Sequence, residues 1–487
     1  MGGILGRVLS CGAYVPRLRL SRECIRRAMG WLDPPTTRAV TGARAICNWD
    51  EDSLTLAVEA ARGCLNGGAV GAVTLASTTL PFADRSNATL LAGALDLADT
   101  TQTLDVTGTL RCGITALAQA ARRADGIATL VVASDARVAK PGSAQELDFG
   151  AGAAAFTVLP GSSSVQEGEP AIAEIHAAAQ IAADFVDHYR MSGESFDYFL
   201  EERWIRDEGF IKLVPSAVDG VLRQAGLTAA EVQHCVMPGN AATIKRVVQA
   251  AGLAGARLQD NLQADCGDTG AAHPLLMLAA VLEVAAPGEN ILLAGFGQGV
   301  DVMLLRVPAG SAAASARQRP VSGALEWRRE ENSYTRYLAH SGLLGVDFGM
   351  RAERDNRSAH SAAWRKHRQV TGFVGGKCTS CGTVQFPRSR VCVNPECRKP
   401  DTQQDFRLAE TIGRVKTFTE DWQAYSPRPP NIYGNIEFEP GGNLLMEVTD
   451  LDSGELHVGD RVRFVFRIKD VDRTRGFRRY FWKATRI

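Results

Sequence analysis

Residues 1–307 alternate short apolar runs with alanine-rich segments that have the periodicity of helices. The strand candidates are residues 71–77, 128–134 and 153–159, and the helix candidates are residues 54–65, 114–124 and 273–285. Strands that alternate with helices form a parallel or mixed sheet whose faces the helices cover. The pattern therefore predicts an α/β domain over residues 1–307.

Two similar glycine-rich turns occur in this α/β region. Residues 149–152 (Phe-Gly-Ala-Gly) and 296–299 (Phe-Gly-Gln-Gly) each open an apolar strand, and a helix and a strand precede each of them. The similarity predicts either two independent turns of one kind or a duplicated core. The matching order of the surrounding elements favours the duplicated core.

Beyond the α/β region the composition changes twice. Residues 308–324 are rich in Ala, Ser, Gly and Pro, as linkers are, and residues 325–370 carry many charges, as surface helices do. A cysteine cluster and several β-rich segments follow. We therefore expect a linker and bridging helices over 308–370, a zinc ribbon over 371–405 and an OB-fold barrel over 406–487. The predicted barrel strands are residues 415–421, 443–450, 460–468 and 477–487.

Length, charge and cysteine content limit the class of protein. A chain of 487 residues exceeds the usual size of one hydrophobic core, so two or three domains are expected. The formal net charge of zero gives no overall field that would attract nucleic acid or an anionic membrane. The N-terminal residues lack the apolar run of a signal peptide or membrane span. We therefore expect a cytoplasmic protein without a membrane partner, whose eleven cysteines serve as thiols, metal ligands or a nucleophile.

Four of the cysteines form two close pairs. These are Cys378 and Cys381, with two residues between them, and Cys392 and Cys397, with four residues between them. Four thiolates in two tight turns suit a tetrahedral zinc ion and leave no open coordination position. The spacing predicts a structural zinc site, and the alternative is a set of free surface thiols.

Cys112 lies between a predicted strand and a predicted helix. The unpaired N–H groups at a helix N-terminus favour a thiolate over a thiol, and a thiolate is the species that attacks a thioester. Cys112 is therefore the candidate nucleophile. The alternative is a small buried residue of the core.

Three segments resemble the hydroxymethylglutaryl-CoA synthases of archaeal type, which belong to the thiolase superfamily together with ketoacyl synthase III. They are residues 12–17 (Gly-Ala-Tyr-Val-Pro-Arg), 50–61 and 133–142. The resemblance covers residues 1–307. It implies a thiolase fold of duplicated αβαβα layers, a homodimer, a CoA thioester substrate and an acyl group carried on Cys112.

Three positions depart from the catalytic set of that family. Thr78 stands where the synthases have a Glu general acid/base, Met237 where they have a His, and Asp268 where they have an Asn. Neither a threonine nor a methionine transfers protons near neutral pH as a carboxylate or an imidazole does. These departures disfavour the synthase reaction itself.

Two residues near the matched turn are candidates for proton transfer in place of the missing groups. One is Asp268, and the other is His273, which superficially resembles the histidine of degradative thiolases. The alternative for His273 is a helix-start histidine bonded to the backbone. His188 and His234 are expected to be structural or exposed.

Other site residues follow from the resemblance alone. Asn240 keeps the family's position and is expected to orient water or a thioester carbonyl, and Arg246 matches a residue that contacts CoA phosphates. Gly297 and Gly299 match the glycine loop near the nucleophile. Their backbone N–H groups, with that of Cys112, are candidates for an oxyanion hole.

The C-terminal part resembles zinc-ribbon plus OB-fold proteins that accompany thiolases and acyl-CoA synthases. The cysteine cluster and residues 412–419, 430–434 and 457–462 carry this resemblance. It implies a module that docks on a thiolase-like partner and sometimes assists CoA binding. OB folds also bind single-stranded nucleic acid, and residues 473–483 combine aromatic and basic side chains. The balanced charge makes nucleic acid the lesser alternative.

The sequence therefore predicts an acyl-CoA-dependent acyltransferase that forms or cleaves a C–C bond next to a thioester through acyl-Cys112. The alternatives are a true hydroxymethylglutaryl-CoA synthase and a non-catalytic CoA-binding scaffold.

Overall fold

The computed structural model describes residues 3–32, 41–65, 68–163, 171–199, 201–311, 320–353, 357 and 359–487. The chain divides into two compact units. Unit 1 comprises Met1–Cys47, Glu59–Thr89 and Thr100–Tyr337, and unit 2 comprises Asn48–Val58, Leu90–Asp99 and Leu338–Ile487. Two short N-terminal segments thus belong to the same unit as the C-terminal part.

Unit 1 is built on one mixed sheet of ten strands. Across the sheet these are β12 (Arg257–Leu258), β11 (His234–Val236), β13 (Asn290–Phe296), β14 (Gly299–Arg306), β8 (Ala173–Ala182), β1 (Gly6–Tyr14), β7 (Ala151–Pro160), β6 (Thr129–Ala136), β4 (Ala72–Ala76) and β5 (Gln102–Val106). In each half a parallel pair (β4 with β6, β11 with β13) is followed by an antiparallel pair (β6 with β7, β13 with β14). Antiparallel β1 and β8 join the halves. This repetition confirms the predicted duplicated core.

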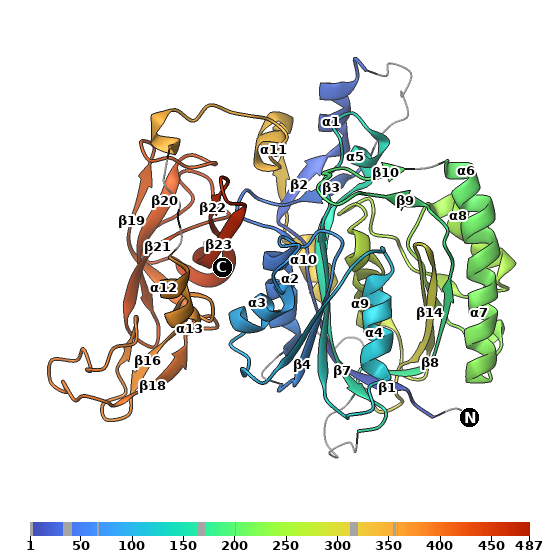
Figure 1. The fold of residues 1–487 in the computed structure, drawn as a ribbon, viewed down its shortest axis with the longest axis horizontal. Coiled ribbons are helices and arrows are strands. Elements are labelled where there is room, and N and C mark those ends of the chain that lie inside the picture. Colours follow the sequence, from blue (N-terminus) through green and yellow to red (C-terminus); the bar gives the residue numbers. More distant parts are fainter. Residues whose placement is uncertain are drawn as a thin grey trace. The chain divides into compact units, whose positions relative to one another are not determined.

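Helices separate the two halves of the sheet and cover them. Helices α4 (Cys112–Ala121) and α9 (His273–Val284) lie between the halves, and α7 (Ile211–Ala225) and α8 (Ala241–Ala250) cover the second half (Figure 1). Residues 275–279 of α9 are completely buried, because a helix enclosed by two sheet layers is apolar on all sides. The six strands and helices predicted within residues 54–285 are all present.

Smaller elements complete unit 1. The remaining strands form a sheet of β15 (Arg329–Glu331), β2 (Leu18–Ser21) and β3 (Ala43–Ile46) and a hairpin of β9 (His188–Tyr189) and β10 (Tyr198–Phe199). The remaining helices are α1 (Arg22–Met29), α5 (Ala144–Asp148), α6 (Glu202–Trp204), the π-helix η1 (Ile205–Phe210), the 3-10 helices η2 (Ala229–Glu231) and η3 (Gly270–Ala272), and α10 (Pro320–Glu326). Three further helices, α2 (Ser53–Leu65), α3 (Asn87–Ala94) and α11 (Tyr334–His340), have residues in both units.

The end of the predicted linker is helical. Residues 312–319 lie outside the described residues, but Pro320 already begins α10. Val321 is buried, and its N–H donates to the Glu283 carboxylate on α9 at 2.6 Å. An acidic side chain at the start of a helix stabilises it, and this contact from α9 could not be found in the linker's own composition.

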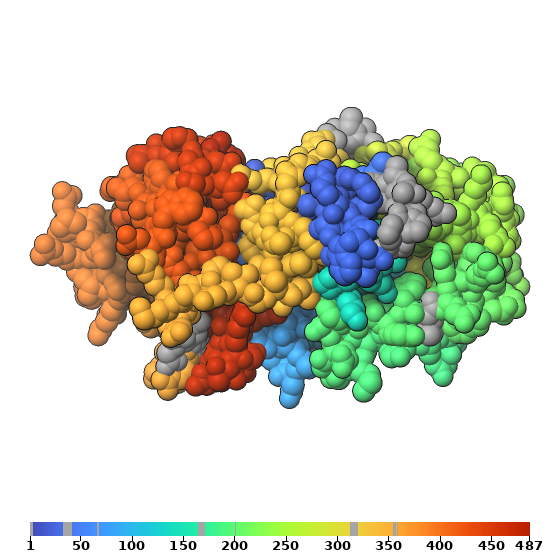
Figure 2. Space-filling model, turned by 90° about the horizontal axis from the view of Figure 1, so that it is seen from above, coloured from blue at the N-terminus to red at the C-terminus, as the bar shows by residue number. Residues whose placement is uncertain are grey.

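Unit 2 contains a small ribbon sheet and a five-stranded barrel. The ribbon strands are β17 (Val384–Gln385), β16 (Val374–Cys378) and β18 (Gln403–Arg407), with α12 (His360–Arg365), α13 (His367–Val370) and the 3-10 helix η5 (Met350–Ala352) preceding them. The barrel strands are β21 (Asn443–Glu447), β20 (Asn431–Phe438), β19 (Gly413–Asp421), β22 (Arg461–Asp472) and β23 (Phe477–Arg486). Figure 2 shows the ribbon in light orange beside the redder atoms of the barrel. The four predicted barrel strands are present, and β20 is an additional one.

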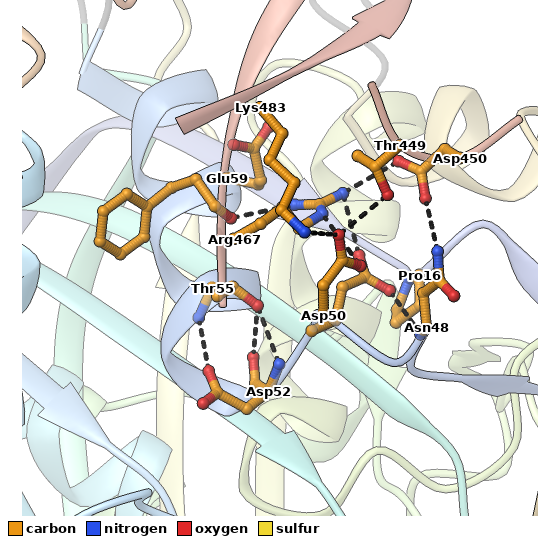
Figure 3. Close-up of polar contacts among 12 residues, drawn as sticks. Pro16, Asn48, Asp50, Asp52, Thr55, Glu59, Thr449, Asp450, Arg467 and Lys483 are labelled. Carbon is orange, nitrogen blue, oxygen red and sulfur yellow. Dashed lines mark hydrogen bonds and ion pairs between the residues drawn. The ribbon is translucent and has the colours of Figure 1, made fainter. Parts of the chain in front are cut away.

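A buried cluster of opposite charges joins residues 48–58 to the barrel within unit 2 (Figure 3). The Asp50 carboxylate lies 3.0 Å from the Lys483 ammonium on β23, and Glu51 lies 3.1 Å from the Arg467 guanidinium on β22. Asp50 and Arg467 are 0% exposed, so both charges are removed from water and each depends on its partner. Residues 48–58 are therefore part of the packing of the barrel.

Candidate active site

Cys112 is the first residue of α4, as the sequence predicts. Its side chain is buried, with 1% of its surface exposed. Gly113 follows it, and a Cβ atom there would lie only 2.6 Å from the Ala271 carbonyl oxygen. The glycine thus lets the start of α4 approach η3, which carries the segment after Asp268.

The Cys112 thiol is not activated in this closed conformation. Burial raises its pKa, and the Asp135 carboxylate raises it further. The backbone N–H groups of Cys112 and Gly113 act in the opposite direction, as predicted for a helix N-terminus, but their effect is smaller. The predicted thiolate therefore requires a change in the surroundings of the sulfur, and solvent or substrate entry is the simplest such change.

Asp135, at the end of β6, is the polar centre of the site, and its carboxylate is 0% exposed. It accepts hydrogen bonds from the Ser77 hydroxyl (2.9 Å), the Thr78 N–H (2.8 Å) and hydroxyl (2.9 Å), the Thr79 hydroxyl (2.8 Å) and the Ala271 N–H (2.8 Å). This carboxylate ties the loop after β4 to η3 beside Cys112. Thr78, a predicted site residue, is therefore fixed by Asp135. The sequence signal for Asp135 is a lone carboxylate in the otherwise apolar run 129–136.

Asp268 keeps part of its side chain in contact with solvent, with 31% of its surface exposed. Burial opposes its ionisation, but the Arg137 guanidinium, 3.6 Å away, and the Gly270 N–H hold the pKa of this carboxyl below its ordinary value. Asp268 is therefore a carboxylate at neutral pH and can accept a proton.

Arg137 links Asp268 to the β9–β10 hairpin, and sequence reasoning missed it. Its guanidinium lies 3.5 Å above the centre of the Phe149 ring and donates to Asp197 at 2.7 Å. Asp197 also lies 3.5 Å from Arg190, whose guanidinium donates to the Thr78 carbonyl. Arg137 lies within residues 133–142, which carry the family resemblance, but its partners are far away in the sequence, so that segment alone does not identify them.

His273 is hydrogen-bonded at both ring nitrogens. Its Nε2 lies 2.7 Å from the Asn261 carbonyl, and its Nδ1 lies 3.1 Å from the Thr269 N–H. Because a carbonyl only accepts and an N–H only donates, this arrangement selects the neutral Nε2–H tautomer. This geometry matches the alternative expected for His273, a histidine at the start of a helix that is hydrogen-bonded to the backbone.

Asn240 and Arg246 lie on α8. The Asn240 side chain caps the helix by accepting from the N–H groups of Ala242 (3.0 Å) and Thr243 (3.3 Å). Arg246 is 55% exposed and lies 3.5 Å from Asp207. Within the described part of the chain, neither side chain is hydrogen-bonded to the residues around Asp135, so the roles predicted for them remain predictions.

The loop containing Gly297 and Gly299 contacts the turn that precedes Cys112. The Gly297 carbonyl accepts from the Thr109 hydroxyl (2.8 Å) and the Arg111 guanidinium (2.9 Å). The Gly297 N–H donates to the Gly299 carbonyl at 3.0 Å, and the Cys112 N–H donates to the Thr109 carbonyl at 3.1 Å. These two predicted oxyanion donors are thus used within their own turns, and the oxyanion hole stays a prediction.

The four cysteines of the ribbon converge. Their sulfur atoms all lie within 4.8 Å of one another, with 3.9 Å between Cys378 and Cys397 and 3.6 Å between Cys381 and Cys392. A tetrahedral ion with Zn–S bonds of about 2.3 Å holds its sulfur atoms about 3.8 Å apart. The donor set and its spacing therefore fit zinc.

Among the helices of the described residues, none has both the length and the apolar character that a membrane-spanning helix needs.

Comparisons with known proteins find relatives for both the α/β part and the C-terminal part of the chain. Residues 222–306 match the family model of the 3-oxoacyl-[acyl-carrier-protein] synthase III C terminal domain. Residues 366–403 and 407–467 match the rubredoxin-like zinc ribbon domain and the C-terminal OB-fold domain of ChsH2. The hydroxymethylglutaryl-CoA synthase of Aeropyrum pernix is 30% identical over 348 residues, which are 69% of this chain and 94% of that protein. The chain belongs to the hydroxymethylglutaryl-CoA synthase family. It is an acyltransferase of the thiolase-like fold with a zinc ribbon and an OB-fold module.

Solved structures agree on the fold. The 3-oxoacyl-(acyl carrier protein) synthase III of Pseudomonas aeruginosa is 23% identical, with a TM-score of 0.54 over 62% of this chain and 98% of that one. A variant of OleA from Xanthomonas campestris is 17% identical, also with a TM-score of 0.54 over 62% and 98%.

The three positions that depart from the family's pattern in the sequence lie in two different environments. Met237 is buried in the apolar core below α8, with 2% of its surface exposed. Thr78 and Asp268 lie instead in the polar network around Asp135 and Arg137. The polar groups around Asp135 and Arg137 are therefore carboxylates, guanidinium groups and the hydroxyls of residues 77–79.

Proposed function

We propose that the chain catalyses a Claisen-type condensation in which Cys112 carries the acyl group of an acyl-CoA. The observation that carries the proposal is the position of Cys112 as the first residue of the enclosed helix α4, where the partial positive charge of a helix N-terminus favours a thiolate. The sulfur attacks the thioester carbonyl carbon, a new C–S bond forms, and CoA leaves as its thiol. Thiolysis is the same sequence in reverse, so this site also supports C–C bond cleavage.

The second half-reaction needs a base. A second acyl-CoA loses a proton from the carbon next to its thioester, and the resulting carbanion attacks acyl-Cys112 and releases the Cys112 thiolate. We propose Asp268 as the acceptor of that proton, because it is a carboxylate near the start of η3 and its side chain is partly exposed. His273 is the weaker candidate, because both of its nitrogens already have partners.

The decisive experiment traps the intermediate. The full chain is incubated with isotopically labelled acetyl-CoA, then digested and analysed by mass spectrometry, with Cys112→Ala as the matched control. A labelled acetyl group on the Cys112 peptide of the wild-type chain alone supports the proposal. If other acyl-CoA chain lengths also leave Cys112 unmodified, the non-catalytic CoA-binding scaffold becomes the better description.

A second candidate reaction is hydroxymethylglutaryl-CoA synthesis, because a relative with that name is 30% identical over 69% of this chain. Supplying acetoacetyl-CoA together with acetyl-CoA separates the two reactions. We expect little hydroxymethylglutaryl-CoA, because Thr78 and Met237 replace the proton-transfer residues that the sequence comparison assigns to the synthases.

We further propose that Cys378, Cys381, Cys392 and Cys397 hold a structural zinc ion. All four ligands come from the protein, so the site has no position for substrate or water. The ion would hold the two turns of the ribbon together in a sheet too small to stabilise itself.

A homodimer is the proposed assembly of unit 1. Among the described residues, β5 is an edge strand that pairs only with β4, and Leu104 on it is 57% exposed. An edge strand has unpaired backbone N–H and C=O groups, and pairing with its equivalent in a second copy would satisfy them. Light scattering on the full chain should give the mass of a dimer, and Leu104→Lys should shift it toward the monomer.

A further inference from the structure

The enclosed position of Cys112 prevents a substrate from reaching its sulfur in this conformation. A thioester carbonyl must reach a sulfur whose residue is 1% exposed. Some neighbouring segment therefore has to move before acyl transfer. Residues 187–199, which include β9 and β10 and are called the 187–199 hairpin below, have the attachments expected of that segment.

The 187–199 hairpin is attached to both sides of the polar centre of the site. On one side, the Arg190 guanidinium donates to the carbonyl of Thr78, whose hydroxyl is bonded to Asp135. On the other side, Asp197 accepts from Arg137, which also lies 3.6 Å from Asp268. Asp135 also accepts from the Ala271 N–H, and the Ala271 carbonyl would lie only 2.6 Å from a Cβ atom at Gly113, the residue after Cys112, so the hairpin is connected to the segments beside the sulfur.

Asp197 holds these attachments together. It lies 2.7 Å from Arg137 and 3.5 Å from Arg190, so one carboxylate forms ion pairs with two guanidinium groups. The exposed fractions of the Asp197 and Arg137 side chains are only 9% and 2%. Removing the carboxylate would leave two arginines without their shared counter-charge, one of them deeply buried, which is strongly unfavourable for the closed arrangement.

Apolar packing contributes little to the position of the hairpin. Its large apolar side chains are exposed, with fractions of 46% for Tyr189, 70% for Met191, 59% for Tyr198 and 47% for Phe199. Its two strands have only two residues each. A segment held by a few polar contacts at its edges can open without unfolding the core beneath it.

We propose that the 187–199 hairpin is a gate over Cys112 and that Asp197 is the positioning residue that keeps it closed. Acyl-CoA enters when the contacts of Asp197 with Arg137 and Arg190 open, and the gate closes again over acyl-Cys112 to exclude water during condensation. The inference rests on the proposed function in one respect, namely that Cys112 is the residue that substrate must reach.

The test measures access to the sulfur directly and does not use turnover. The full chain is treated with iodoacetamide, and the rate of alkylation of Cys112 is followed by mass spectrometry of its peptide. We expect Asp197→Asn to raise this rate about tenfold or more, because it removes the shared counter-charge of two arginines. Asp219→Asn is the matched control, since Asp219 pairs with Arg223 on the exposed face of α7.

Two buried cysteines of unit 1 serve as internal standards. Cys64 and Cys235 are both 0% exposed and should keep their slow alkylation in every variant. Asp197→Glu, which retains the charge, should restore most of the protection of Cys112. An unchanged Cys112 rate in both Asp197→Asn and Arg190→Gln would overturn the gate, and so would an equal rise at Cys64 and Cys235.

The outcome separates the gate from the proposed function. If labelled acetyl-CoA acylates Cys112 while Asp197→Asn leaves alkylation unchanged, the nucleophile stands and the gate is wrong. If alkylation responds as expected while no acyl group is ever trapped, the gate stands and the function is wrong.

Discussion

The carboxylate of Asp135 raises the pKa of the Cys112 thiol that it helps to position. The first prediction follows from this effect of Asp135 on the pKa of Cys112. Asp135→Asn removes the charge and should lower the pKa of Cys112, so that alkylation by iodoacetamide begins at a lower pH than in the wild-type chain. Arg111 is the other charged group that acts on this sulfur, and its effect lowers the pKa in both proteins.

The same variant also tests the positioning role of Asp135. An asparagine accepts through one oxygen where the carboxylate accepts through two, so some of the five hydrogen bonds from residues 77–79 and Ala271 must be lost. We expect a lower kcat despite the easier ionisation of Cys112. A variant that ionises more easily and also turns over faster would show that Asp135 has no positioning role.

The second prediction compares the two candidate bases. Asp268→Asn should lower kcat about 100-fold or more, because an amide cannot accept the proton. His273→Gln should have the smaller effect, since its amide can still donate to the Asn261 carbonyl as the Nε2–H does now. Steady-state kinetics with the acyl-CoA that best acylates Cys112 provides the measurement. Asp268→Asn also restores the family's residue at this position, so unchanged turnover would show that the carboxylate is dispensable.

The third prediction concerns the zinc ribbon. Cys392→Ser should abolish stoichiometric zinc in the purified chain and lower the temperature at which unit 2 unfolds. Metal analysis and thermal unfolding provide the measurements. Cys24→Ser in unit 1, outside the cluster, is the matched control and should keep its zinc. A chain with the same metal content in both variants would contradict the assignment.

The features that could be predicted from the sequence depend on local patterns. The strand-to-helix transition predicts Cys112 at the start of α4, and the spacing of Cys378, Cys381, Cys392 and Cys397 predicts a metal site. The spacing of apolar residues and the residue types in turns are set within a few neighbouring positions. A short stretch of sequence is therefore enough to predict the structures that depend on them.

The features that could not be predicted depend on pairing between distant segments. Arg137 and Asp197 are 60 residues apart, and Asp50 and Lys483 are 433 apart. In the sequence, Asp50, Glu51 and Asp52 look like solvated charges at the start of a helix, yet all three are buried. A charge that is buried next to its partner has the same local sequence as one in water, so only the tertiary structure distinguishes them.

That buried acidic segment gives the last prediction, which concerns the pH dependence of stability. Burial, opposed by the charge of Arg467, raises the pKa of Glu51 to about 7. In the unfolded chain the pKa of a glutamate is about 4.3. Between these values the folded chain binds more protons at Glu51 than the unfolded chain does. The free energy of unfolding contributed by Glu51 therefore falls as the pH rises from about 4.5 through 7. Glu51→Gln cannot ionise, so it should match the wild-type chain near pH 4 and exceed its stability above pH 8, by about 3 kcal/mol. Urea unfolding of the full chain at several pH values measures this difference.

Glu437→Gln, at an exposed position on β20, is the control and should show no such change of stability with pH. If the difference between Glu51→Gln and the wild-type chain were constant across the pH range, Glu51 would have to be ionised at all these pH values and paired with Arg467 throughout.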